Sequence, residues 1–177
     1  MPSEDLRIIK TRKAIRDTFI EMRKTLPVEK IHVRELCRNA MINKSTFYNH
    51  YEDIFALENE LEDEAVEQFL ANFEDKDCLL TEPLRFLTKM PPIFDANMEQ
   101  LLPLFRDNMD AAFFKLEIKL RQIYETPDMS QEDRIRLSFI LNGTMHTLRE
   151  LKFGEGCDEK IFINSLAELI QKTAKSC

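Results

Sequence analysis

The chain has 177 residues, of which 44% are hydrophobic and 32% charged, and it carries a net charge of −7. This composition is typical of a folded globular protein and excludes an intrinsically disordered chain. Only 3 glycines are present, too few for the many turns of a β-sandwich or barrel, so we expect an all-α fold.

The charge is unevenly distributed along the chain. Residues 1–51 contain 11 Lys and Arg and 6 Asp and Glu, a net charge of +5, whereas the other 126 residues contain 14 and 26, a net charge of −12. A basic first third in an acidic protein suggests that only this third meets a polyanion. A chance fluctuation in charge is the alternative explanation.

Three helices are predicted in the basic third. Apolar residues recur every three, four or seven positions over 6–26, which predicts a helix that Pro27 ends. A short helix is expected over 33–40. A third is expected over 44–51, with Asn43 as its N-cap and with Phe47 and Tyr51 on its buried face.

The middle of the chain predicts four more helices. A long amphipathic segment covers 54–73, and a helix over 81–90 is expected to end at Pro91-Pro92. Helices then follow over 94–104 and 109–124, with Pro103 as a kink or a boundary.

The last two helices are expected over 131–151, with Ser130 as N-cap, and over 159–175, joined by the loop 152–158. Their apolar surface is wider than one partner helix would cover. Pairing this hairpin with that of a second copy would give a four-helix bundle, whereas packing on the chain's own middle helices is the alternative. The predicted homodimer interface consists of Leu137, Leu141, Leu148, Phe162, Leu166 and Leu169.

Cysteine spacing and hydropathy indicate the cellular compartment in which the protein is expected. The 4 cysteines form no CxxC pair, the first residues lack an apolar signal region, and no apolar run reaches membrane-spanning length. We therefore expect reduced thiols in a cytoplasmic protein without a membrane partner. Cys37 stands at an apolar helix position, where a small buried side chain is expected.

Catalytic and metal-binding patterns are absent from the sequence. The 3 histidines lie outside metal-ligand spacings, and neither a Gly-rich phosphate loop nor a GxSxG motif is present. We therefore predict no metal site, no cofactor and no enzymatic activity.

Two short helices with a tight turn at 40–43, braced by a longer basic helix, have the form of a helix-turn-helix. The stretch IHVRELCRNAMINKSTFYNHYEDIFAL, residues 31–57, resembles the DNA-binding region of TetR/AcrR-type transcriptional regulators. More weakly, LEIKLRQIYE and SFILNGTMHTLREL resemble the C-terminal domain of a subgroup near the regulators of dihydroxyacetone kinase operons.

The resemblance implies two domains and a function. Residues 1–53 would form a DNA-binding domain with three helices, and residues 54–177 a helical domain for effector binding and dimerisation. The implied function is sequence-specific regulation of transcription at a double-stranded DNA operator, usually repression relieved by a small-molecule effector. A protein-interaction adaptor or co-activator with weak DNA binding is the main alternative, and a small-molecule-binding helical enzyme a third.

The polar residues of 44–50 suit the major groove, because base edges and phosphates require mixed donors and acceptors. The resemblance implies that Tyr48 and His50 bind phosphates, and Asn49 is suited to pair bidentately with adenine. The predicted DNA-contacting residues are Arg34, Lys44, Ser45, Thr46, Tyr48, Asn49 and His50. The first helix is expected to bring further cations near the flanking backbone: Lys10, Arg12 and Lys13. A solvated surface helix is the alternative interpretation.

Three positions depart from the pattern of the family. His32 stands where Thr or Ser usually caps the second helix, and Met41 stands where the turn usually has Gly. If that position needs a positive φ, Met costs about 1–2 kcal/mol, and otherwise the turn has a different shape. Ile54 replaces a common phosphate-binding Lys, and Glu52-Asp53 add repulsion, so these changes weaken the expected affinity.

A pocket for an effector is expected among the middle helices, where Met and Phe are frequent. Its predicted lining is Phe86, Met90, Phe94, Met98, Phe105, Met109, Phe113, Tyr124, Asn142 and His146. A plain hydrophobic core explains the Met and Phe set equally well, and Asn142 and His146 would also fit a dimer interface.

Overall fold

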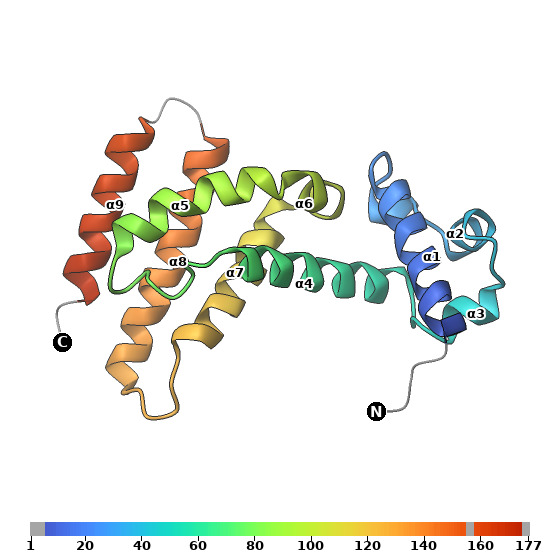
Figure 1. Ribbon diagram of the computed structural model, residues 1–177, viewed down its shortest axis with the longest axis horizontal. Helices are drawn as coiled ribbons and strands as arrows, with labels where there is room; N and C mark the ends of the chain where they lie inside the picture. The colour runs from blue at the N-terminus through green and yellow to red at the C-terminus, as the bar shows by residue number, and fades with distance from the viewer. Residues whose placement is uncertain (1–5, 155–157, 175–177) are drawn as a thin grey trace. The chain divides into compact units, whose positions relative to one another are not determined.

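The computed structural model describes residues 6–154 and 158–174 (Figure 1). These residues form nine α-helices and one 3-10 helix without any strand, which confirms the predicted all-α fold. None of the helices in the described ranges is long and apolar enough to cross a membrane. Part of the predicted loop 152–158, together with Cys157 and Cys177, lies outside the described residues.

The helices follow the predicted order closely. Their bounds are α1 Leu6–Arg23, η1 Val28–Lys30, α2 Val33–Asn39, α3 Lys44–Tyr48, α4 Ile54–Asn72, α5 Pro83–Ala96, α6 Met98–Phe105, α7 Met109–Tyr124, α8 Gln131–Phe153 and α9 Glu159–Ala174. Ser130 caps α8 as predicted, because its Oγ accepts a hydrogen bond of 3.1 Å from the Asp133 amide.

The chain divides into two compact units. The first contains residues 1–65 and 99–107, and the second contains residues 66–98 and 108–177. The predicted boundary after residue 53 therefore differs from the observed division. The first part of α4 and residues 99–107 belong to the same unit as the N-terminal helices, which the sequence pattern does not indicate.

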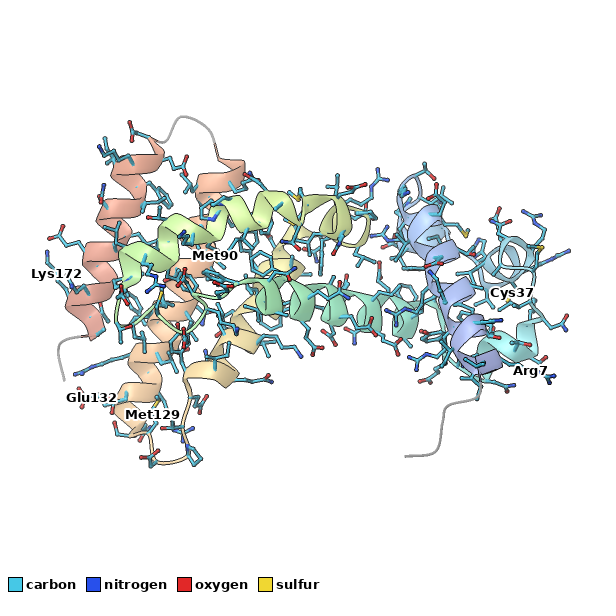
Figure 2. The ribbon with its side chains drawn as sticks, in the orientation of Figure 1. Arg7, Cys37, Met90, Met129, Glu132 and Lys172 are labelled. Carbon is cyan, nitrogen blue, oxygen red and sulfur yellow. The ribbon has the colours of Figure 1, made fainter. Side chains whose placement is uncertain are left out.

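The core of the first unit is built where α1 contacts α2 and α2 contacts α3. Ile15 and Phe19 of α1 lie one turn apart and are fully buried, as the helical spacing predicts. Leu36 of α2 and Phe47 of α3 are equally inaccessible. Cys37 beside them is buried, as expected from its apolar position (labelled in Figure 2).

In the second unit, α8 contacts both α7 and α9, and α9 also contacts α5 (Figure 1). Its core is aromatic and aliphatic. Phe73 and Phe86 have ring centroids 4.9 Å apart, and both are fully buried. Leu120 of α7 and Leu141 of α8 are fully buried as well.

The prediction that Pro91-Pro92 ends a helix is wrong. α5 continues through both prolines to Ala96. Each proline lacks an amide hydrogen, so two helical hydrogen bonds are lost. Met90 and Phe94 nevertheless keep helical spacing across the prolines, and both are buried. We attribute the continuation of α5 to the packing of these two side chains. Such packing depends on residues distant in sequence, so the local rule that proline ends a helix does not include it.

Candidate nucleic-acid interface

The turn between α2 and α3 has the hydrogen bonds of a Schellman motif. The Ile42 amide donates to the Cys37 carbonyl at 2.9 Å, and the Met41 amide donates to the Arg38 carbonyl at 3.3 Å. Met41 has a φ of 56° and is the one non-glycine residue with positive φ in the described part of the chain. It is also 91% exposed, so no packing offsets the strain.

Met41→Gly is expected to stabilise the first unit by about 0.5–1 kcal/mol. Glycine removes a backbone strain of about 1–2 kcal/mol, but it also raises the entropy of the unfolded chain by up to about 1 kcal/mol. Urea unfolding followed by circular dichroism measures the change. Met41→Ala serves as the control, since it shortens the side chain and keeps the strain; equal stability of the two variants would contradict the expectation.

α3 is held to the unit by two aromatic residues. Phe47 is fully buried and Tyr51 is 5% exposed, and their ring centroids lie 5.8 Å apart. The Phe47 ring also meets the ring of Tyr48 edge to face at 5.5 Å. The predicted helix over 44–51 ends at Tyr48, although the amides of His50 and Tyr51 still bond the Phe47 carbonyl.

The predicted DNA-contacting residues all remain accessible. Tyr48 is 55% exposed. The side chains of Thr46 and His50 are half-buried, and the remaining members of the set are exposed: Arg34, Lys44, Ser45 and Asn49. Because Phe47 and Tyr51 are buried, α3 has one apolar face packed on the unit and one polar face directed outward.

Neither short helix has a side-chain cap at its N-terminus, which differs from the sequence prediction at α3 only. Asn43 occupies the N-cap position of α3 without a side-chain hydrogen bond to the helix, so its predicted capping role is wrong. His32 likewise precedes α2 without such a bond. Ile54 is buried, and Asp53 accepts a hydrogen bond of 2.7 Å from the Ala56 amide. Asp53 therefore caps α4, a role that Asp directly before a helix signals in sequence.

Part of the basic charge on α1 is neutralised by α4. Arg12 Nη2 lies 2.9 Å from Glu60 Oε1, and Arg16 pairs with both Glu60 and Glu64. The Tyr51 hydroxyl donates to the same Glu60 oxygen at 3.0 Å. Arg12 is therefore part of a bonded cluster with α4. This corrects the expectation that all three cations predicted on α1 are available to a polyanion.

The sequence prediction overlooked a buried arginine. Arg23 is 2% exposed and has two carboxylate neighbours: Nη1 lies 2.7 Å from Asp107 Oδ2, and Nε lies 3.1 Å from Glu58 Oε1. It also donates to the carbonyls of Leu26 and Leu104, each at 2.9 Å. The ion pair with Glu58 joins the end of α1 to α4, and the hydrogen bonds join it to α6 and to Asp107 shortly after α6, all within the first unit.

Glu58 is the most strongly perturbed acid near Arg23. Burial raises its pKa to about 7, and Arg23 opposes that rise. The acidic neighbours Glu62, Glu29 and Asp107 raise it further. At neutral pH this carboxyl group is therefore close to the midpoint of its titration.

The predicted effector pocket is divided in the structure. Met90, Phe94 and Phe113 line a cavity of about 270 Å³ in the second unit. Asn142 and His146 line a separate, shallower depression of about 300 Å³, in which Phe113 also takes part. Since the two hollows have different linings, the predicted residues do not form one site.

The remaining predicted pocket residues line neither hollow: Phe86, Met98, Phe105, Met109 and Tyr124. Phe86 and Phe105 are buried in the cores of different units, as the plain-core alternative required. The Tyr124 hydroxyl donates to the Lys76 carbonyl at 2.7 Å and accepts from the Leu79 amide at 2.8 Å. Its role is therefore to hold the segment between α4 and α5.

Most of the predicted dimer residues are part of the chain's own core. The side chains of Leu137, Leu141, Leu148 and Leu166 are at most 8% exposed, while Phe162 is half-buried and Leu169 is 61% exposed. The helical spacing of apolar residues identifies the buried face of α8 and α9. In this structure that face packs against other helices of the second unit and not against a second copy of the chain. Among the side chains of α8 and α9 that the structure describes, the large apolar ones left exposed are Ile135, Phe139, Ile161 and Leu169.

Comparison with models of known protein families and with curated proteins found no match to this chain. Among the described residues, no group of three or more His, Cys, Asp or Glu side chains is arranged to hold a metal ion.

Proposed function

We propose that this chain is a DNA-binding transcriptional regulator that acts as a homodimer and does not catalyse a reaction. The observation that carries the proposal is the two-sided character of α3. Phe47 and Tyr51 anchor it, and donors and acceptors of several kinds lie on its accessible side. Such a helix suits the major groove, where each base pair presents its own pattern of donors and acceptors.

Two further observations support groove binding. α2, the turn and α3 form a helix-turn-helix that α1 braces, and residues 31–57 resemble the DNA-binding region of TetR/AcrR-type regulators. The exposed Arg34 and Lys44 add positive charge on α2 and α3. Phosphate contacts from such residues supply affinity, whereas Asn49 is the residue best suited to read adenine.

Binding to a random-sequence duplex pool tests the proposal. A regulator is expected to select a sequence, and its log K is expected to fall with log salt by about 0.9 per neutralised phosphate. Asn49→Ala is expected to cost about 1–3 kcal/mol at one base position only, whereas Tyr48→Phe weakens binding to all sequences alike. Asn164→Ala on α9 is the matched control, because Asn164 is exposed and lies outside the first unit.

A protein-interaction adaptor is the second candidate, and the charge on α1 favours it. Glu60 and Glu64 neutralise Arg12 and Arg16, and the acids Glu52 and Asp53 lie close behind α3. An adaptor would show neither a selected sequence nor a steep salt dependence. If Asn49→Ala and Tyr48→Phe leave binding unchanged, the adaptor replaces the regulator as the preferred function.

The homodimer is proposed to form through outward residues of the second unit. Phe139 of α8 is 70% exposed, and Ile135 lies one turn before it. Phe139→Glu is expected to raise the dimer dissociation constant at least about tenfold, which sedimentation equilibrium measures. Gln131→Glu, exposed at the start of the same helix, serves as the control. Equal self-association of the two variants would place any dimer contact elsewhere.

A further inference from the structure

The cavity of about 270 Å³ in the second unit has an apolar wall and a charged mouth. Its wall includes Met90 of α5, labelled in Figure 2, and the rings of Phe94 and Phe113. These two rings are stacked, with centroids 5.5 Å apart and planes 23° apart. A flat apolar group is therefore complementary to this wall.

The volume restricts the size of the occupant. Sites for drug-sized ligands measure roughly 300–1,000 Å³, so this cavity suits a smaller molecule, such as one ring with a short side chain. Met90 adds a flexible, polarisable side chain that adapts to different shapes. Size and shape alone do not choose between a neutral, an anionic and a cationic ligand.

The charged side chains at the mouth of the cavity indicate which charge the ligand carries. Asp95, Lys152 and Glu159 line the cavity, and Lys152 Nζ is bonded to Asp95. Glu159 has no ionic or hydrogen-bonding partner within residues 6–154 and 158–174. An anion would find the single ammonium group already occupied and two carboxylates nearby. A cation would find a free carboxylate and aromatic rings, both of which attract positive charge.

The presence of an acidic residue at position 159 also has an explanation that involves no ligand. Glu159 is the first residue of α9, where an acid interacts favourably with the helix dipole. That role accounts for the residue type, but it does not account for the hollow lined by stacked rings beside it. The two observations together favour a binding site.

We infer that this cavity binds a small organic monocation with an aromatic or compact apolar body. The amine or ammonium group lies at the mouth near Glu159, and the body lies against Phe94 and Phe113. As a binding site the inference stands on the cavity alone, whereas as an effector site it rests on the proposed regulatory function.

Calorimetric titration of the full chain with three matched probes tests the inference. 2-Phenylethylamine, 2-phenylethanol and 3-phenylpropionate share one ring and a short side chain, and they differ in charge. The amine is expected to bind at least about tenfold more tightly than either of the others. Equal or tighter binding of the carboxylate would overturn the inference, as would the failure of the amine to bind at about 1 mM.

Three variants locate the effect. Glu159→Gln is expected to weaken amine binding about tenfold and to leave alcohol binding unchanged, whereas Glu168→Gln, exposed on the same helix and outside the cavity, changes neither. Lys152→Met frees Asp95, so it is expected to tighten amine binding and weaken carboxylate binding. A purely structural role for these residues predicts no such dependence on ligand charge, and equal behaviour of the two glutamate variants would overturn the site.

These titrations need no DNA, and the duplex experiment needs no ligand. Loss of amine selectivity would overturn the binding site and leave the DNA-binding proposal standing. Loss of salt-dependent DNA binding would do the reverse. If both hold, the amine is expected to change the affinity for the selected duplex.

Discussion

Arg23→Met is expected to lower the free energy of unfolding of the first unit by about 3–5 kcal/mol. The guanidinium is 2% exposed, and its bonds end on Asp107, Glu58 and two backbone carbonyls. Removing it leaves Asp107, the Leu104 carbonyl and the Leu26 carbonyl without their cationic donor, and it leaves Glu58 without its ionic partner. Buried polar groups that lose a partner cost more than the bond itself contributed.

The measurement is equilibrium unfolding in urea, with the helical signal as readout. Lys24→Met is the control, because Lys24 follows directly in sequence and pairs with Glu21 at an exposed position. That variant is expected to leave the stability nearly unchanged, because water screens an exposed ion pair. Arg23→Lys is expected to recover only part of the loss, since an ammonium cannot reproduce the planar array of donors. Similar small losses in the methionine variants at 23 and 24 would contradict the assignment.

A double variant separates the charge from the packing. If Arg23→Met is damaging because it strands a carboxyl group, then adding Glu58→Leu is expected to restore part of the stability. The effects of the two substitutions would then be strongly non-additive, as for residues in direct contact. Simple addition of the two losses would show that Arg23 and Glu58 act independently.

The sequence predicts two elements with a strong local pattern to the residue. The helix over 109–124 and the N-cap Ser130 match α7 and the start of α8, because helical spacing and capping are properties of neighbouring residues. The helix across Pro91-Pro92 was missed because contacts with distant helices, and not the local sequence, keep it helical. The resemblance leaves open whether Met41 adopts a positive φ or the turn is reshaped, and the structure shows a φ of 56° at Met41.

At the candidate interface, too, features that depend on neighbouring residues could be predicted, whereas contacts between residues distant in sequence could not. Burial of Phe47 and Tyr51 and exposure of Tyr48 follow from the helical spacing of one short segment. The pairing of Arg12 with Glu60 joins residues 48 positions apart, so no local pattern reveals that this arginine has a partner. Arg23 is one of the basic residues of the first third, and the residues next to it do not indicate that it is buried. Its burial depends on the segment at 104–107, which lies 81 or more positions away.

Glu58 makes the stability of the first unit depend on pH near neutrality. Its pKa is about 7 in the folded protein, against an ordinary value of 4.5. The folded state therefore binds this proton more tightly than the unfolded state does. The resulting stabilisation is present in full below pH 4.5, decreases as the pH rises from 4.5 to 7, and is lost above pH 7.

The size of this effect follows from the shift in pKa. A difference of 1 in pKa between the folded and unfolded states corresponds to about 1.36 kcal/mol. The raised pKa of Glu58 therefore lowers the free energy of unfolding by about 3 kcal/mol between pH 4.5 and pH 8. The physical cause is that burial of the charged carboxylate costs more than its attraction to the Arg23 charge offsets. Arg23 keeps Asp107 as a counter-ion when Glu58 is neutral.

Glu58→Gln isolates this contribution, because glutamine resembles the protonated carboxyl group at every pH. The variant is expected to exceed the stability of the parent protein by less than about 1 kcal/mol at pH 5 and by up to about 3 kcal/mol at pH 8. Urea unfolding at pH 5, 6, 7 and 8 measures the difference, and Glu52→Gln, exposed in the same unit, is the control. Parallel pH profiles for the parent and Glu58→Gln would mean that Glu58 is ionised throughout, with Arg23 outweighing its burial.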